Sequence, residues 1–156
     1  MIRPVFEMTT EEERQFRTMA SPVSEDPKVT RMQDFIQHGN KSTYDHCMDV
    51  ARTAFIINRR LHIGADEQKL VRASILHDYF LYDWHYKGDN LHGYHHPAIA
   101  SHNAEADFHI TRKEQKMIES HMWPLTFFHI PTSRGGWILT VADKICSSRE
   151  VVKNRT

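Results

Sequence analysis

The chain has 156 residues, enough for one compact domain with a hydrophobic core, and no linker rich in glycine or serine divides it. Twenty basic and twenty acidic side chains cancel to a formal charge of zero, which excludes an overall basic field that would draw the protein to nucleic acid. The apolar runs are too short to cross a bilayer and the first residues lack the apolar core of a signal peptide, so we expect a cytoplasmic protein with no membrane partner.

Helical signals dominate, and no segment alternates polar and apolar residues for long enough to predict a sheet, so we predict an all-α bundle. Thr10 and Glu13 have the spacing of a capping box and predict a first, loosely packed helix that ends about ten residues later. Asp26 and Pro27 predict the N-cap and first residue of a second helix, which ends near Gly39.

Two longer helices follow. Ser42, with Asp45 three residues later, predicts a helix to about His62 that carries His46 in its first turns. Asp66 caps the next helix, and the pair His77-Asp78 falls near its C-terminal end. We expect residues 1–40 to form an N-terminal helical extension and residues 41–150 to form the core of a single domain.

The second half begins with a predicted aromatic-rich surface loop over residues 83–96. Pro97 opens a predicted helix to about Phe108. A capping box of Thr111 with Glu114 opens another to about Met122, with His121 in its last turn. Residues 137–153 are predicted to form the last core helix, and Asp143 lies within it.

The twelve histidines are spread through the chain, which indicates metal binding rather than a histidine tag. Possible donors recur every twenty to thirty residues, about one for each helix or helix junction. A helical bundle builds a metal site in this way, because facing helices each project one ligand into a shared cavity. Mixed imidazole and carboxylate donors suit ions such as Fe, Mn, Zn or Co and are poor ligands for Ca. The donors are, in order, His46, His77, Asp78, His96, His121 and Asp143.

In this order the residues resemble the HD superfamily of metal-dependent phosphohydrolases, whose pattern is a lone His, an adjacent His-Asp pair and a distant Asp in a late helix. His46, His77, Asp78 and Asp143 match those places, and the sequence VADKICSSRE at 141–150 is similar to the terminal helix of that family. The resemblance covers about residues 41–149. It implies an HD-domain-like helical bundle and hydrolysis of a phosphate ester or anhydride. The expected substrate is a nucleotide.

A subgroup with two metal ions adds two histidines, the first usually followed by proline, and His96-Pro97 and His121 fit that description. The resemblance implies that His46, His77, Asp78 and Asp143 hold one ion, and that His96, His121 and a bridging Asp78 hold a second. The expected cofactor is one or two divalent ions of Fe, Mn, Zn, Co, Ni or Mg. The Gly-Tyr-Pro signature of the HD-GYP cyclic-dinucleotide phosphodiesterases is missing, as is the lysine that follows their His-Asp pair.

The expected chemistry needs a metal-activated water and positive charge around the phosphoryl oxygens. Asp78, His85 and Lys144 are the candidate catalytic residues, with His85 or Asp83 moving protons and Lys144 supplying charge. Other cations that could help are Lys87, Arg72 and Arg149. The partner is a small phosphate or nucleotide, and the early helices could support a homo-oligomer.

Simpler interpretations exist for several residues. We expect His38, His62, His92, His109 and His129 to be surface or hydrogen-bonded residues. His95 or His102 could replace His96 as the ligand, although the proline that follows His96 favours His96. Cys47 and Cys146 are expected to be reduced, buried and inert, because no nearby base completes a nucleophile. Trp84, Tyr86, Tyr94 and Trp123 could stack on a base, but such residues more often belong to the core.

Two other functions fit the same donors. A metal-containing nucleotide sensor would bind a nucleotide without turnover, so the nucleotide would raise its melting temperature. A di-iron oxygenase would contain iron and consume oxygen.

Overall fold

The computed structural model of the chain describes residues 7–79 and 92–155, with no description of the side chains at positions 38, 92–94, 154 and 155. In this part of the chain the structure is helical apart from one two-stranded hairpin, which confirms the all-α prediction. The elements are α1 (Thr10–Ser24), α2 (Pro27–Thr30), the 3₁₀ helix η1 (Arg31–Asp34), β1 (Ile36–His38), β2 (Lys41–Ser42), α3 (Thr43–Arg60), α4 (Glu67–Leu76), α5 (His92–Phe108), α6 (Arg112–Glu119) and α7 (Arg134–Arg155).

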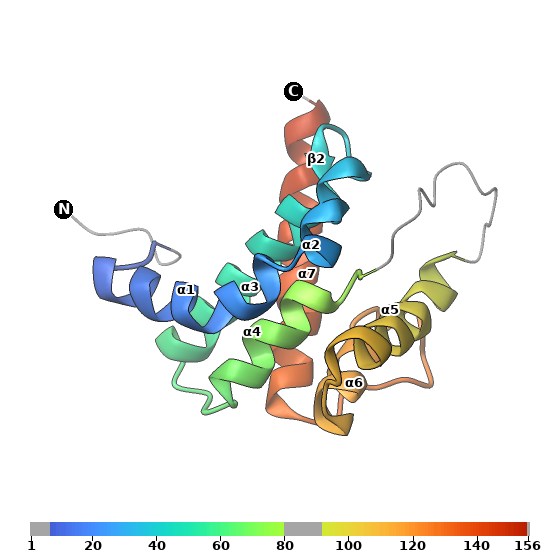
Figure 1. Cartoon of the computed structure of the whole chain (residues 1–156). Coiled ribbons are helices and arrows are strands. Elements are labelled where there is room, and N and C mark those ends of the chain that lie inside the picture. Colours follow the sequence, from blue (N-terminus) through green and yellow to red (C-terminus); the bar gives the residue numbers. More distant parts are fainter. Residues whose placement is uncertain (1–6, 80–91, 156) are drawn as a thin grey trace.

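Helix α3 lies at the centre of the bundle and packs against both α4 and α7 (Figure 1). Helix α1 covers α4 from one side, while α5 and α6 pack together and α6 contacts α4 and α7. The interior therefore lies between helices from both halves of the sequence. None of the helices in the described residues is both long enough and apolar enough to cross a membrane.

Helix α1 differs from its prediction in start, length and packing. Its capping box consists of Thr9 and Glu12, one residue earlier than the predicted pair, and the helix continues four residues past Ala20. Phe16 has no solvent exposure and packs edge-on against Phe55 of α3, with the ring centroids 5.7 Å apart. The expectation of loose packing was therefore wrong, because the apolar face of α1 is part of the core.

The second helix is much shorter than predicted. Asp26 and Pro27 do cap and open it, but α2 ends at Thr30 and η1 follows. The chain then forms the antiparallel hairpin β1–β2, turning through Gly39 at a φ of 58°. The prediction of a helix to Gly39, and of no sheet, was wrong. Strands of three and two residues are too short to produce a recognisable alternation.

Helices α3 and α4 begin where their caps predict. The Ser42 side chain accepts a hydrogen bond from the backbone N–H of Asp45, and the Asp66 side chain accepts one from that of Lys69. His62, directly after the C-cap Leu61, has the left-handed φ of 50° that ends α3, and Gly64 has a φ of 81° in the connection to α4. Helix α4 ends at Leu76, so the pair His77-Asp78 follows the helix directly, as predicted.

Three boundaries in the second half differ from prediction. Helix α5 already begins at His92, so residues 92–96 are helical rather than loop and Pro97 lies inside the helix; residues 83–91 lie outside the described residues. The Thr111 capping box is confirmed, but α6 ends at Glu119 and leaves His121 in the following turn. Helix α7 starts at Arg134. A Cβ at Gly135 would lie 2.7 Å from Met117 Cε, so a glycine there permits close approach to α6.

Candidate metal centre

The six predicted donors converge on one buried cluster from separate elements. His46 comes from α3, His77 and Asp78 from the end of α4, His96 from α5, His121 from the turn after α6 and Asp143 from α7. The side chains of His46, His77 and His121 have no solvent exposure, and the other three residues are at most 7% exposed. The donors form two groups with the geometry to hold a metal ion, one of His46, His77 and Asp143 and one of Asp78, His96 and His121.

The first group surrounds Oδ1 of Asp143 and Oδ2 of Asp78. Nε2 of His46 lies 3.0 Å from the Asp143 oxygen and 3.6 Å from the Asp78 oxygen. Nε2 of His77 lies 3.4 Å from each of the same two oxygens. Two imidazole nitrogens and two carboxylate oxygens therefore face one another.

The second group lies against the other oxygen of Asp78. Oδ1 of Asp78 is 3.2 Å from Nε2 of His96 and 3.5 Å from Nε2 of His121. The two imidazole nitrogens are 3.0 Å apart. Asp78 is thus shared, because each of its oxygens faces a different pair of histidines.

The separations between donors match those around a small dication. Nitrogen and oxygen ligands lie about 2.0–2.2 Å from such an ion, so neighbouring donors in tetrahedral or octahedral coordination are about 3.0–3.5 Å apart. The separations within both groups run from 3.0 to 3.6 Å.

Two of the described histidines are also held in the form that binds a metal. Nδ1 of His77 donates to the Ser74 carbonyl oxygen and Nδ1 of His121 donates to that of Ile118, both at 2.6 Å. With the proton on Nδ1, a neutral ring presents the lone pair of Nε2 to the cluster.

Two polar atoms of the cluster lack a hydrogen-bond partner among the described residues: Nε2 of His77 and Oδ1 of Asp78. An unpaired buried polar atom costs about 1–3 kcal/mol, so such atoms are uncommon in a finished core. A cation between the donors would satisfy both atoms. The donor set and these two atoms therefore fit a divalent metal ion.

Electrostatics in the cluster favour ionised carboxylates. Burial alone would raise the pKa of Asp78, but the imidazoles of His77, His121 and His96 that face it hold that pKa well below its ordinary value. Burial opposes the ionisation of Asp143 as well, but the imidazoles of His46 and His77 that face it hold its pKa well below the ordinary value. Two buried negative charges thus face the imidazoles, an arrangement that attracts a cation.

Sequence reasoning missed two residues that contact the cluster. The side-chain amide of Gln37, on β1, donates to Oδ2 of Asp78 at 2.9 Å. Nδ1 of His46 lies 2.8 and 3.0 Å from the two carboxylate oxygens of Glu150. Glu150 follows Asp143 by seven residues, and this two-turn spacing on one helix face could have identified it. Gln37 had no comparable signal, because its hairpin was not predicted.

The alternative histidines lie away from the cluster. His95 and His102 are exposed on α5, whereas His96 is buried and faces Asp78 and His121. His62, His109 and His129 are also exposed, as expected. The side chains of His38 and His92 are outside the described part of the structure, as are those of Trp84, Tyr86 and Tyr94.

The two cysteines are free and buried, as expected. Sγ of Cys146 lies 3.4 Å from Oγ1 of Thr53. Cys47 is closer to the cluster than expected: its sulfur lies within 4.8 Å of donor atoms of His77 and Asp78.

Lys144, another candidate catalytic residue, lies beside the cluster. Its Nζ donates to the backbone oxygen of His121 at 3.3 Å. Arg72 is paired with the buried Glu114 through contacts of 2.6 and 2.7 Å, so the charge of its guanidinium is offset by that carboxylate. Trp123 packs edge-on against Trp137, with centroids 5.3 Å apart. Asp83, His85 and Lys87 lie outside the described residues.

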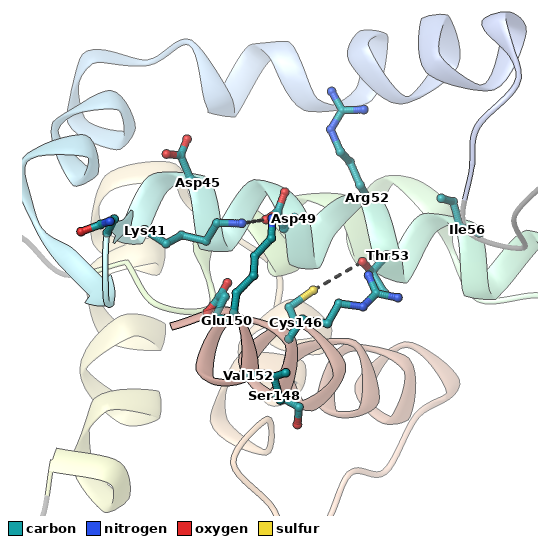
Figure 2. A pocket seen from close by; sticks show the side chains of 13 residues that line it. Lys41, Asp45, Asp49, Arg52, Thr53, Ile56, Cys146, Ser148, Glu150 and Val152 are labelled. Atoms are coloured by element: carbon teal, nitrogen blue, oxygen red, sulfur yellow. Dashed lines mark hydrogen bonds and ion pairs between the residues drawn. The ribbon is translucent and has the colours of Figure 1, made fainter. Parts of the chain in front are cut away.

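A cavity of about 1010 Å³ lies between α3 and the C-terminal half of α7 (Figure 2). Its lining includes Lys41, which forms an ion pair with Asp49, and Glu150, which also contacts His46. None of the six donors lines this cavity. Glu150 therefore borders the cavity and also contacts the cluster.

Comparison of the chain with protein-family models, with curated proteins and with solved structures finds no match. The functional assignment therefore depends on the residues and their geometry.

Proposed function

We propose that this chain is a metal-dependent phosphohydrolase that cleaves a phosphate ester or anhydride, in a nucleotide substrate, and that it is a small member of the HD superfamily. The observation that carries the proposal is the buried convergence of four imidazoles and two carboxylates with donor separations of 3.0 to 3.6 Å. The order of the donors along the chain, which resembles that superfamily, supports the choice of hydrolysis.

The residues would divide between two ions. His46, His77, Asp143 and one oxygen of Asp78 would hold the first, and His96, His121 and the other oxygen of Asp78 would hold the second. When bound, divalent ions such as Mn, Fe, Co, Zn, Ni or Mg supply a water activated as nucleophile and charge that offsets the phosphoryl oxygens.

The protein's own groups would orient these parts. Asp78, held by Gln37, presents one oxygen to each pair of histidines. Lys144, whose ammonium donates to the backbone oxygen of His121, is proposed to add positive charge near a bound phosphate. His85 stays in the proposal as the residue that moves a proton to the leaving group.

Elemental analysis of the purified protein, together with a screen of phosphate esters and nucleotides in Mn²⁺, Co²⁺, Ni²⁺ and Mg²⁺, tests the proposal. We expect bound transition metal and metal-stimulated phosphate release. Asp78→Ala should abolish both, whereas His102→Ala, an exposed histidine on α5, should retain both.

Other outcomes would contradict hydrolysis. Near-wild-type turnover by Asp78→Ala would show that the cluster around Asp78 is not the catalytic site. A nucleotide that raises the melting temperature without turnover would support a sensor instead. Bound iron with oxygen consumption and no phosphate release would support an oxygenase.

A further inference from the structure

The carboxylate of Glu150 lies directly behind one candidate ligand. Both of its oxygens are within 3.0 Å of Nδ1 of His46, while Nε2 of the same ring faces Asp143 and Asp78. Glu150 is only 7% exposed, and it comes from the same helix, α7, as Asp143. Two turns of one helix therefore supply a candidate ligand and a group that holds a neighbouring ligand.

The other rings with a described Nδ1 contact are held differently. His77 and His121 donate through Nδ1 to the neutral backbone oxygens of Ser74 and Ile118. Nδ1 of His46 faces a carboxylate instead. A carboxylate that accepts the Nδ1 proton fixes the ring orientation and makes Nε2 a stronger donor than a carbonyl does.

The half of the cluster in front of Glu150 carries further negative charge. It contains Asp143 and shares Asp78, and the Glu150 carboxylate lies behind it. Among the described residues, the second half consists of His96 and His121 with the shared Asp78. Buried charges at such short range are weakly screened, so the charges of Asp143 and Glu150 act directly on a cation in the first half.

We infer that Glu150 is a positioning residue that makes the two halves unequal: the half around His46, His77 and Asp143 binds a divalent cation more tightly and fills first. This inference rests on the cation-binding part of the proposed function and is independent of the substrate. Lys41 attracts Glu150 from the cavity side, but its ammonium is also paired with Asp49. The Glu150 carboxylate therefore still favours a cation at His46.

The test is calorimetric titration of the metal-free full chain with Mn²⁺, and separately with Zn²⁺, with native mass spectrometry to count bound ions. Wild-type protein should bind two ions in two resolved steps. Glu150→Ala should weaken the first step by about 10- to 100-fold and leave the second unchanged. Glu150→Gln retains an oxygen that can accept the Nδ1 proton but lacks the charge, so its first step should fall between those of wild type and Glu150→Ala.

Glu12→Gln is the matched control, because Glu12 is another buried carboxylate, on α1, and is paired with Arg60 away from the cluster. It should change neither step. If Glu150→Ala fails to fold, as judged by circular dichroism, the affinity of Glu150→Gln for the first ion alone tests the inference.

The outcomes separate this inference from the proposed function. Wild-type affinities for both ions in both Glu150 variants would overturn the role of Glu150. An equal loss of affinity in both binding steps would overturn the inference that Glu150 favours one half of the cluster. Two equal wild-type steps would overturn the inference and leave the proposed function standing. Absence of any ion binding by wild-type protein would overturn both.

Discussion

Gln37 donates a hydrogen bond of 2.9 Å to Oδ2 of Asp78 and so connects the N-terminal hairpin to the middle of the candidate metal centre. The two residues are 41 positions apart in the sequence. Oδ1 of the same carboxylate is left facing His96 and His121. The first forty residues, which showed no motif, thus provide the group that orients the shared carboxylate.

Replacing Gln37 with methionine should destabilise the metal-free protein, because the side chain has a similar size but cannot donate to Asp78. Loss of one partner of a buried hydrogen bond to a charged group should lower the free energy of unfolding by about 1–3 kcal/mol. Urea unfolding of the metal-free protein measures this. Gln33→Met, at an exposed position in η1, is the control. Equal stability of the two variants would show that the Gln37 bond contributes nothing.

Removal of metal should lower the melting temperature. The cluster buries the ionised carboxylates of Asp78 and Asp143, and among the described residues Nε2 of His77 has no hydrogen-bond partner; a cation would satisfy all three groups. Mn²⁺ at 100 times the dissociation constant of a site should restore about 2.7 kcal/mol of stability through that site, since the assembled site exists only in the folded chain. Differential scanning fluorimetry after chelation, with and without Mn²⁺, measures the effect. Asp78→Ala should show no response to Mn²⁺, and a wild-type protein that ignores both chelator and Mn²⁺ would contradict the metal centre.

Loss of either histidine in the second group should remove one ion and leave the other. His96→Ala and His121→Ala should each bind one equivalent of Mn²⁺, because the first group keeps its two histidines and both carboxylates. His102→Ala should keep two equivalents, since His102 is exposed on the same helix as His96. Native mass spectrometry counts the ions. Two equivalents in His96→Ala would mean that His96 is not a ligand.

Much of the fold was predictable where local chemistry determines it. Side-chain caps at Ser42, Asp66 and Thr111 mark helix starts because each satisfies a free backbone N–H, and each is observed. Helix ends were less predictable. Helix α6 ends at Glu119, before Pro124 could force it to end. Gly135 and Gly136 lie inside α7, and at Gly135 the close approach of Met117 favours a residue without a side chain.

The candidate site shows the same division. The six donors were predictable because imidazoles and carboxylates that recur about once per helix are typical of a metal site in a bundle. Gln37 and Glu150 were missed because their role depends on which side chain each one contacts. Such contacts depend on the packing of the hairpin and of α7 against α3, which a single sequence does not display.

Acid should weaken the ion pair that attaches α1 to α3. The pKa of Glu12 is lowered from 4.5 to about 2, because hydrogen bonds from Arg60 and from the backbone of Thr9 favour the carboxylate over its protonated form. A pKa that is lower in the folded than in the unfolded chain stabilises the fold fully above about pH 4.5, and this stabilisation is lost as the pH falls toward 2. Glu12→Gln should therefore melt below wild type at about pH 6, and the gap should narrow at about pH 3.5. Thermal unfolding followed by circular dichroism at the two pH values measures the gap.

Glu105→Gln, at an exposed position on α5, is the control and should have the melting temperature of wild type at both pH values. If the difference in melting temperature between Glu12→Gln and wild type stays constant with pH, the charge on Glu12 is not what stabilises the contact.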